Sequence, residues 1–561
     1  MSIKIRHAVA TALLLGAAGS ASAFDITTYT GTPLYVGGST AIDKALLAYF
    51  EQTADTTSPC ITNDAGNPID VYTGTQSGVK FIAVACTANT TNTGAVADSA
   101  GHIVFIKEDN GGSLNGIQGV GLPANGGINL VFPAFGGLTS GTVCDTSAKA
   151  AVAGVTSAFN AHACPGTGTT STYSARTPAI QGNMGFADVE ASLFGKDPGF
   201  NALTDPTGLD LVGKPTIDIV FAPGVSLGLY HALQKAQGLP QDDQTADIPS
   251  LSTAALSSLF TGQITDWSKV TDVNGAISAQ TNIQFGTSGA PAAQFNGGAP
   301  GSPAQTKVYF CRRDDGSGTE KTSEIVFGNN VCSTGNTNFR TAVGQTLGNS
   351  WTQAPGTLPA AAVFAGNGTG AVLNCLQGID EGGGYAIGYG SVDNGWGSKG
   401  STNAAGVGNQ DFRWIKVDNV VPSIENAASG KYRYWAQSSL YTPGAQAGHN
   451  PAGGDALVLQ NYLTGVHNIN TGIGAAEAIA ALDTSNRWTN GPTWDGGVLA
   501  IPANLGNALN ASTGVTITQF QGNPVNDFVK AVAGVNDNCQ ASIAASGVTA
   551  GGNGVVSWSS P

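Results

Sequence analysis

Charged residues are scarce in this sequence of 561 amino acids. Only 11% of the residues are Asp, Glu, Lys or Arg, and 37 acidic against 23 basic residues give a formal net charge of −14. An acidic chain repels the phosphate backbone of nucleic acid, so we expect neither DNA nor RNA as a partner. A small anionic ligand would have to be held by local dipoles and one or two cations, against the field of the whole protein.

Cys-x-x-Cys pairs are missing, and the six histidines are scattered. The sequence therefore predicts neither a zinc site nor a haem attachment, and we expect no cofactor. The eight cysteines are an even number, which favours disulfides in an exported protein. Cys60 with Cys86 and Cys144 with Cys164 are candidate local bridges. Spacing does not pair the other four, Cys311, Cys332, Cys375 and Cys539.

Long apolar runs are absent beyond the N-terminus. Residues 1–23 contain the basic residues Lys4 and Arg6, a short apolar run over 8–18 and a small-residue end at Ala23. This pattern is typical of a cleavable secretory signal. No later segment has about 18 consecutive apolar residues, so we expect no membrane span in the mature chain. The prediction is a periplasmic or secreted protein, and we expect a monomer.

Strand and helix patterns alternate along the chain, which favours an α/β fold. Strands are predicted over 80–86 and 102–107, and helices over 225–237 and 253–260. The length suggests two or more domains, and no fixed-period repeat is present. Stretches rich in Gly, Thr and Asn are predicted to be loops or insertions. They cover 87–101, 110–127, 137–175, 286–305 and 398–410.

One junction gathers groups that bind oxyanions. The apolar run 308–310 leads into Cys-Arg-Arg-Asp-Asp-Gly-Ser-Gly-Thr-Glu, which ends at Glu320. A strand that turns into a helix start here exposes backbone N–H groups without intrahelical partners at the positive end of the helix dipole. Arg313 could add a bidentate fork, and the hydroxyls of Ser317 and Thr319 could add donors.

Two further stretches near the N-terminus have the same chemistry. Residues 34–50 predict a strand, a Gly-Gly turn and a helix with an apolar face, capped by Ser39 or Thr40. Residues 72–80 place Thr75 and Ser77 in a glycine-rich turn before an apolar run. Taken alone, the first stretch is better explained by an ordinary helix cap, so neither stretch is specific by itself.

The order of these motifs resembles that of the periplasmic phosphate-binding proteins of ABC phosphate uptake systems. These PstS-like proteins are a branch of the type II periplasmic binding protein superfamily. The most specific segments are Leu-Phe-Thr-Gly-Gln-Ile-Thr-Asp-Trp, which ends at Trp267, and the Arg-Arg-Asp-Asp-Gly-Ser-Gly-Thr of 312–319. Weaker matches are Gly-Phe-Ala-Asp ending at Asp188 and Gly-Tyr-Ala-Ile-Gly-Tyr ending at Tyr389.

The resemblance implies a phosphate site and no metal. Its ligand-binding residues would be Thr40, Ala41, Thr75, Asp188, Arg313, Ser317, Gly318 and Thr319. Ala41 stands where the family often has Phe, so only its backbone N–H would contribute. Asp315 would support the site by holding the Arg313 fork. Asp188 would accept the proton of hydrogen phosphate, which sulfate at neutral pH does not have to give.

The implied fold is a two-lobed α/β periplasmic binding protein-like fold of type II with long loop insertions. Lobe I would comprise residues 24–220 and 436–561, and lobe II residues 221–435. Hinge closure would bury the anion between the lobes. The partners would be inorganic phosphate and, as a further candidate, an ABC permease, and the chain would bind its ligand for uptake or scavenging.

Two alternatives stay open. Gly-Val-Ser-Leu-Gly over 224–228 lies between an apolar run and a predicted helix, the context of a hydrolase nucleophile elbow. Ser226 could then serve a secreted phosphatase or esterase, with His449 or His467 as its base. On the binding-protein fold, weak phosphatase activity or a surface interaction role is the other alternative. The binding-protein interpretation itself predicts a protein that is not an enzyme.

Overall fold

The computed structural model describes about half of the chain. The described residues are 26, 29–51, 59–61, 69–76, 79–89, 101–108, 112–133, 159–164, 179–195, 206–242, 245–280, 283, 285, 306–328, 332, 339–341, 346–347, 357–394, 412–464, 497–499, 526, 528–532 and 535–544. The predicted signal over 1–23 and three residues named above, Ser77, Cys144 and His467, lie outside them.

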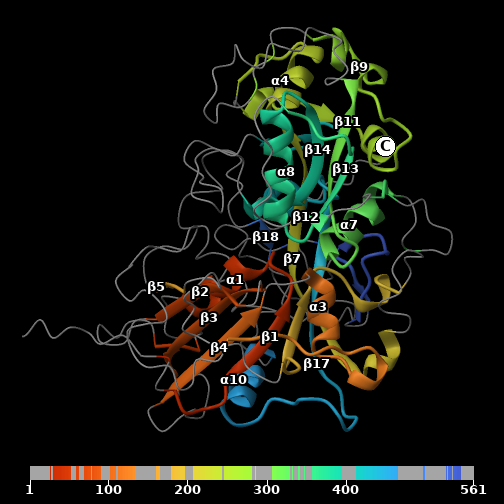
Figure 1. The fold of residues 1–561 in the computed structure, drawn as a ribbon. Coiled ribbons are helices and arrows are strands. Elements are labelled where there is room, and N and C mark those ends of the chain that lie inside the picture. Colours follow the sequence, from red (N-terminus) through yellow and green to blue (C-terminus); the bar gives the residue numbers. More distant parts are fainter. Residues whose placement is uncertain are drawn as a thin grey trace, which may run out of the picture.

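A mixed sheet of fourteen described strands runs through the molecule (Figure 1). Its order is β12-β13-β11-β14-β7-β17-β6-β1-β4-β3-β2-β5, and β15 and β18 also pair with β7. The strands are β1 Leu34–Gly38, β2 Ile69–Gln76, β3 Val79–Thr87, β4 His102–Glu108, β5 Phe159–Ala163, β6 Met184–Ala187, β7 Leu211–Ser226, β11 Val308–Arg313, β12 Thr346–Leu347, β13 Val363–Gly366, β14 Tyr385–Ser391, β15 Phe412–Trp414, β17 Trp435–Pro443 and β18 Val498–Leu499.

Helices cover this sheet, and four two-stranded ribbons flank it. The helices are α1 Asp43–Glu51, α3 Gly112–Gln118, α4 Leu227–Ala236, α5 Thr253–Phe260, α7 Gly318–Phe327, α8 Thr369–Glu381, α9 Ile424–Ala428 and α10 Gly454–Thr464. The ribbons pair β8 Ser250–Leu251 with β16 Lys416–Val417, β9 Thr271–Asp272 with β10 Gly275–Ala276, β19 Phe528–Val529 with β22 Ile543–Ala544, and β20 Ala531–Val532 with β21 Val535–Asn536. The α/β class and the strands and helices predicted in the N-terminal and central segments are confirmed.

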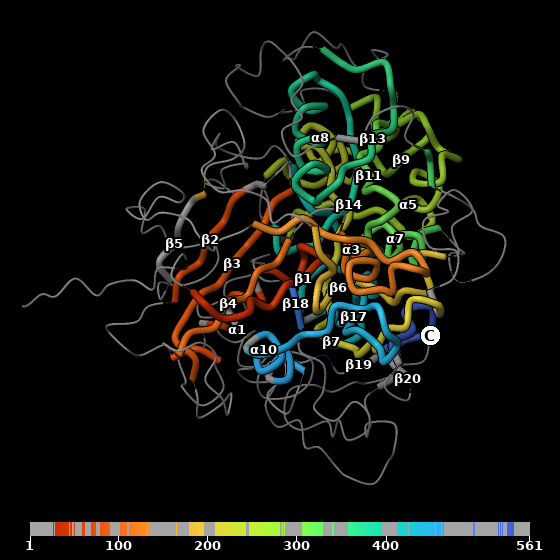
Figure 2. Tube along the Cα trace, turned by 60° about the horizontal axis from the view of Figure 1, so that its bottom comes forward, coloured from red at the N-terminus to blue at the C-terminus, as the bar shows by residue number. Residues whose placement is uncertain are grey.

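Two parts of the sheet form two lobes. The strands β1 to β6 carry α1, α3 and α10 and make up lobe I, while β11 to β14 carry α7 and α8 and make up lobe II (Figures 1 and 2). The long strands β7 and β17 join them. β7 pairs antiparallel with β17 from Leu211 to Val220, and with β14 from Phe221 onward. A single strand therefore passes from one lobe into the other.

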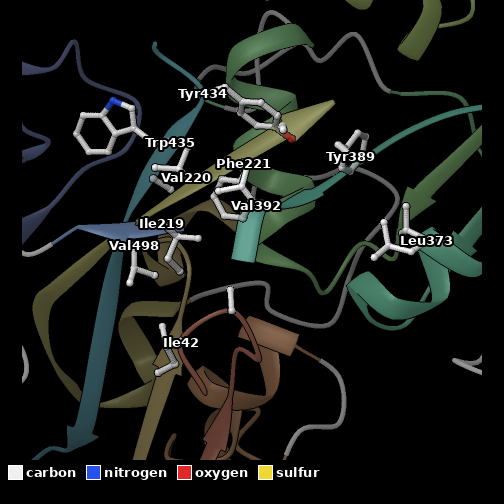
Figure 3. Close-up of a cluster of buried hydrophobic side chains, with 14 of the residues drawn as sticks. Ile42, Ile219, Val220, Phe221, Leu373, Tyr389, Val392, Tyr434, Trp435 and Val498 are labelled. Carbon is white, nitrogen blue, oxygen red and sulfur yellow. The ribbon is translucent and has the colours of Figure 1, made fainter. Parts of the chain in front are cut away.

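The joint between the lobes is packed with large apolar side chains. Figure 3 shows Phe221 of β7 beside Tyr434 and Val392, and the ring centroids of Phe221 and Tyr434 are 5.7 Å apart. Phe327, the last residue of α7, packs edge-on against Tyr434 at 4.9 Å. Burial of each such ring contributes roughly 2–3 kcal/mol. These contacts fix the place where the chain crosses between the lobes.

Two of the predicted loops contain regular structure. The Gly-rich stretch 110–127 holds helix α3, whose residues Ser113, Leu114 and Ile117 are buried. The stretch 137–175 holds strand β5, which pairs parallel with β2. The loop predictions were wrong in these segments. In α3 the glycines allow close packing, since an added Cβ on Gly116 would collide with the backbone of Phe186 in β6.

Three described disulfides join the elements. Cys60–Cys86 is one of the two predicted local bridges, and it lies at β3 of lobe I. Cys311–Cys375 ties β11 to α8 inside lobe II. Cys332–Cys539 joins residues 207 positions apart. Cys164 is also disulfide-bonded. Among the described residues, no helix is both long and apolar enough to cross a membrane.

Candidate functional site

The carboxylate of Asp188 lies at the centre of the contact between the two lobes. It follows β6, whose residues pair in parallel with β1, so that the carboxyl ends of both strands meet at one edge. Ser39, the residue after β1, donates a hydrogen bond from its hydroxyl to Asp188 Oδ1, and its backbone N–H donates to Phe186 O at 2.9 Å. Asp188 is 3% exposed. The register of two parallel strands thus buries an acid beside a serine.

Helix α3 adds a second serine to the acid. The backbone N–H of Asp188 donates to Ser113 Oγ over 2.9 Å. Ser113 is the second residue of α3, after Gly112, which has a φ of +61°. The Leu114 N–H donates across the lobes to Gly316 O, 3.0 Å away. The start of α3 is therefore part of lobe I's contact surface toward α7.

Helix α7 brings its N-terminus from lobe II onto the same acid. Thr319 Oγ1 donates to Asp188 Oδ2 at 3.3 Å. Ser317 caps the helix, because its hydroxyl accepts from the Glu320 N–H. Among the described residues, no acceptor bonds the N–H groups of Gly318 and Thr319. A Cβ on Gly318 would lie 2.5 Å from Ser113 Oγ and 2.6 Å from Asp188 Cβ. Glycine is needed here for the close approach.

The guanidinium of Arg313 lies at the same place, buried to 3% exposure. Its Nε donates to Gly366 O at 3.2 Å, and one terminal nitrogen donates to Thr369 Oγ1 at 3.3 Å. The other terminal nitrogen bonds Asn367 O at 3.4 Å and lies 3.4 Å from where a Cβ on Gly112 would be. The turn between β13 and α8 holds this cation against the start of α3.

Burial raises the pKa of the Asp188 carboxyl. The hydrogen bond from Ser39 opposes this rise most, followed by the positive charge of Arg313 and the bonds to Thr319 and Ser113. Burial thus favours the protonated form of this carboxyl, while its hydrogen bonds and the charge of Arg313 favour the charged form. The arrangement is suited to an oxyanion that shares a proton with the carboxylate.

Asp315 does not contact Arg313. Its Oδ1 lies 2.5 Å from a terminal nitrogen of Arg312, and its side chain is 40% exposed. The reason is the alternation of side chains along β11, which sends Arg312 and Arg313 to opposite faces. Arg312 pairs on its face with buried Glu320 at 2.5 Å, and the Tyr389 hydroxyl also bonds to Glu320.

The remaining predicted site residues are placed as follows. Thr40 and Ala41 lie next to Ser39, and the Ala41 N–H donates to Ser39 Oγ at 3.2 Å. Thr75 lies in β2, paired with Lys80. The order β1-β4-β3-β2 puts β2 three strands from β1, roughly 14 Å away. The structure therefore brings together Asp188, Arg313, Ser317, Gly318 and Thr319 beside Thr40 and Ala41, and leaves Thr75 apart.

Sequence reasoning missed three residues of this cluster. Ser39 was considered only as a helix cap, and Ser113 was assigned to a loop. Thr369 begins α8 after Gly366-Asn-Gly, the same kind of strand-turn-helix junction as the one at Ser317. The signal for Ser113 and Thr369 was available: each follows a glycine-containing turn that comes directly after a strand.

Ser226 has no nucleophile geometry. It ends β7, is fully buried, and its hydroxyl accepts a hydrogen bond from the Ala386 N–H at 3.1 Å. His449 bonds Asp210 Oδ2 at 3.1 Å and Val120 O at 3.0 Å in lobe I. The described residues therefore form no triad around Ser226.

Two other features of the described residues carry no ligand chemistry. Glu190, Asp537 and Cys539 lie together, but the Cys539 sulfur is bonded to Cys332 and cannot ligate a metal. A cavity of about 620 Å³ lies in lobe II, away from Asp188. Its three charged groups already make hydrogen bonds: Lys416 to Ala246 O, Asp418 to Thr253, and Asp272 to the Val273 N–H.

Comparison with known proteins gives one family match. Residues 234–463 match the family described as "PBP superfamily domain". This match, over about two fifths of the chain, confirms the resemblance to periplasmic binding proteins. No curated protein matches the sequence.

Solved structures give distant matches. A phosphate ABC transporter substrate-binding protein with bound phosphate from Clostridium perfringens has 13% identity and a TM-score of 0.28, over 54% of this chain and 77% of that chain. An ABC-type phosphate transport receptor from Vibrio cholerae has 12% identity and a TM-score of 0.26, over 54% and 79%. PstS from Borrelia burgdorferi has 11% identity and a TM-score of 0.24, over 58% and 86%. At these scores the matches carry no argument about the ligand.

Proposed function

We propose that this chain, with its periplasmic binding protein superfamily domain, is an exported solute-binding protein that holds hydrogen phosphate between its lobes. One observation carries the proposal. The buried carboxylate of Asp188 in lobe I faces the N-terminus of α7 and the guanidinium of Arg313 in lobe II. A single proton acceptor among many donors is the complement of a protonated oxyanion.

The proposed donors come from both lobes. Lobe I supplies the hydroxyls of Ser39 and Ser113, with Thr40 and the Ala41 N–H beside them. Lobe II supplies Arg313, Ser317 and the first-turn groups of Gly318 and Thr319, which lie at the positive end of the α7 dipole. Thr75 is left out of the proposed site because it lies three strands away.

Selectivity would follow from the charge of Asp188. A buried acceptor opposed to a second acceptor costs roughly 1–3 kcal/mol, and more when the groups are charged. Sulfate carries no proton at neutral pH, so it would leave two oxygens facing each other without a hydrogen. Hydrogen phosphate would donate to the carboxylate. This difference corresponds to one or more decades in affinity.

Opening of the lobes would admit the anion. The two lobes touch directly through Thr319 with Asp188 and through Leu114 with Gly316. An anion reaching Asp188 must separate these pairs, and the same donors then turn to the ligand. Since β7 and β17 join the lobes, bending of these strands is the proposed hinge. The proposed role is uptake, with an ABC permease as partner, or scavenging.

Catalysis is not part of the proposal. The Ser226 hydroxyl is buried and accepts a hydrogen bond from the Ala386 N–H, and the hydroxyls around Asp188 are assigned to the anion as hydrogen-bond donors. The proposed role of the chain is therefore to bind and release its anion unchanged.

Thermal unfolding of ligand-stripped protein tests the function. The protein is unfolded and refolded to remove bound anion, then heated with millimolar phosphate or with sulfate at matched ionic strength. A ligand that binds only the folded state raises the Tm by mass action. We expect phosphate to raise the Tm and sulfate to leave it unchanged. A Tm that phosphate does not move, or that both anions move equally, contradicts the proposal.

A further inference from the structure

The hydrogen-bond partners of the Arg313 guanidinium in lobe II are all uncharged. They are the backbone oxygens of Gly366 and Asn367 and the hydroxyl of Thr369, at 3.2, 3.4 and 3.3 Å. Three partners on one turn define both the plane and the direction of the guanidinium. None of these three partners carries a negative charge.

This arrangement follows from the sheet. β11 and β13 are parallel neighbours, and Arg313 is in register with Gly366. Their carboxyl ends therefore meet, and the turn after β13 folds over the end of β11. Gly366 O accepts from the Asp314 N–H as well as from Arg313 Nε. Thr369, at the first position of α8, is 6% exposed and closes the turn over the guanidinium.

Two nearby acids of lobe II bond to the neighbouring arginine. Asp315 and Glu320 pair with Arg312. Glu320 also accepts from the Tyr389 hydroxyl and from the backbone N–H of Arg313. Asp314 follows Arg313 in sequence, and its carboxylate makes no hydrogen bond to the guanidinium in the described part of the chain. Burial raises the pKa of Asp314, and the charge of Arg313 opposes this rise, so Asp314 is an acid of lobe II that acts on Arg313 through charge alone. The carboxylate that acts on Arg313 across the contact is Asp188 of lobe I.

We propose that Thr369 is a positioning residue for Arg313, and that the neutral turn over 366–369 keeps the charge of Arg313 available to the bound anion. The inference rests on the proposed function as far as phosphate is concerned. Its structural part, the orientation of Arg313 by Thr369, does not. An acid at the position of Thr369 would hold the guanidinium equally well and would neutralise it.

Three substitutions at one position separate orientation from charge. Thr369→Ser keeps the hydroxyl, Thr369→Val removes it at constant shape, and Thr369→Asp replaces it by a carboxylate. Aspartate in the first turn of a helix favours the helix dipole, so Thr369→Asp should not weaken α8. Thr253→Val is the matched control, since Thr253 begins α5 and bonds Asp418 on another side of lobe II.

Phosphate binding by calorimetry gives the first measurement. We expect Thr369→Ser and Thr253→Val to bind as the wild type does. Thr369→Val should bind about fivefold to tenfold more weakly, as for the loss of one hydrogen bond of ordinary strength, because Arg313 keeps its bonds to Gly366 and Asn367. Thr369→Asp should bind at least tenfold more weakly with an unchanged Tm in the absence of phosphate. We expect the largest loss of phosphate affinity in Arg313→Ala, which removes the guanidinium itself.

The NMR signal of the Arg313 Nε–H, recorded without phosphate, gives the second measurement. A fixed guanidinium gives a sharp, exchange-protected signal. We expect this signal in the wild type, Thr369→Ser and Thr369→Asp, and its broadening or loss in Thr369→Val. An unchanged signal in Thr369→Val overturns the positioning role, whether or not the wild type binds phosphate. Wild-type affinity in Thr369→Asp, in a protein that binds phosphate, overturns the role assigned to charge.

Discussion

Thr319 of lobe II donates a hydrogen bond from Oγ1 to Oδ2 of Asp188 in lobe I, across 3.3 Å. The bond joins the first turn of α7 to the acid that follows β6. Because the residue on one lobe is a donor and the residue on the other an acceptor, the lobes can meet without leaving either group buried and unpaired. The same two groups would face an anion placed between them.

The amide variant of Asp188 tests anion selectivity. An asparagine side chain offers an N–H₂ group that can donate to sulfate, while its oxygen is a weaker acceptor for the proton of phosphate. We expect Asp188→Asn to weaken phosphate binding at least tenfold and to lower the phosphate-to-sulfate affinity ratio by a decade or more. Titration calorimetry with both anions measures this ratio. Asp272→Asn, an exposed acid of β9, is the control, and an unchanged ratio in Asp188→Asn would count against a proton-accepting role.

The stability of the ligand-free protein should also depend on Asp188 through pH. The pKa of Asp188 is about 3.8 in the unfolded chain, and burial raises it in the folded chain. At a pH between the unfolded-state and the folded-state pKa, the folded chain therefore binds more protons than the unfolded chain. Stability then falls as the pH rises through this window. Asparagine does not titrate. We therefore expect the Tm of Asp188→Asn, measured relative to wild type by scanning calorimetry without phosphate, to rise from about pH 4 upward. A constant difference across the range contradicts the raised pKa.

Much of the fold could be predicted because its elements are strongly patterned. The apolar spacing at Ile42, Ala45, Leu46 and Phe50 gave helix α1, and these residues are buried in the core. A helix was predicted over 253–260, and α5 has these same boundaries. The start of the helix is defined by Ser252, whose hydroxyl accepts a hydrogen bond from the Ala255 N–H. Local pattern and tertiary structure agree at such elements.

The candidate site was less predictable because its residues meet through strand order. No local sequence pattern shows that β6 pairs with β1 or that β2 lies three strands away from β1. For this reason the sequence could not show that Thr75 lies apart from Asp188. Similarly, the sequence places Asp315 close to both Arg312 and Arg313. Only the alternation of β11 decides that it bonds to Arg312.

A single added methyl group at Gly318 should prevent the two lobes from closing. A Cβ on Gly318 would lie 2.5 Å from Ser113 Oγ and 2.6 Å from Asp188 Cβ, both in the other lobe. Alanine favours a helix over glycine by about 1 kcal/mol, so lobe II should not lose stability. We expect Gly318→Ala to bind phosphate at least tenfold more weakly by calorimetry, with little change in ligand-free Tm. Gly453→Ala is the control, because a Cβ there meets nothing within 4 Å. Wild-type affinity of Gly318→Ala would show that ligand binding does not need this close approach.

The Cys332–Cys539 disulfide should restrain the opening of the lobes. Cys332 follows α7 in lobe II, and Cys539 lies in the C-terminal segment that bonds to lobe I through Asn538 and Glu190, at 3.0 and 2.7 Å. Besides β7 and β17, this bridge is therefore a further covalent connection toward the other lobe.

Removal of this bridge should change both stability and ligand release. We expect Cys332→Ser/Cys539→Ser to lower the free energy of unfolding by about 2–5 kcal/mol, because the bridge closes a long segment of the unfolded chain. Phosphate release, followed by stopped-flow fluorescence, should become faster, since one restraint on opening is gone. In the control Cys60→Ser/Cys86→Ser the lost bridge lies within lobe I, so stability should fall while the release rate stays the same. Equal release rates in both double variants and the wild type would rule out a role of Cys332–Cys539 in opening.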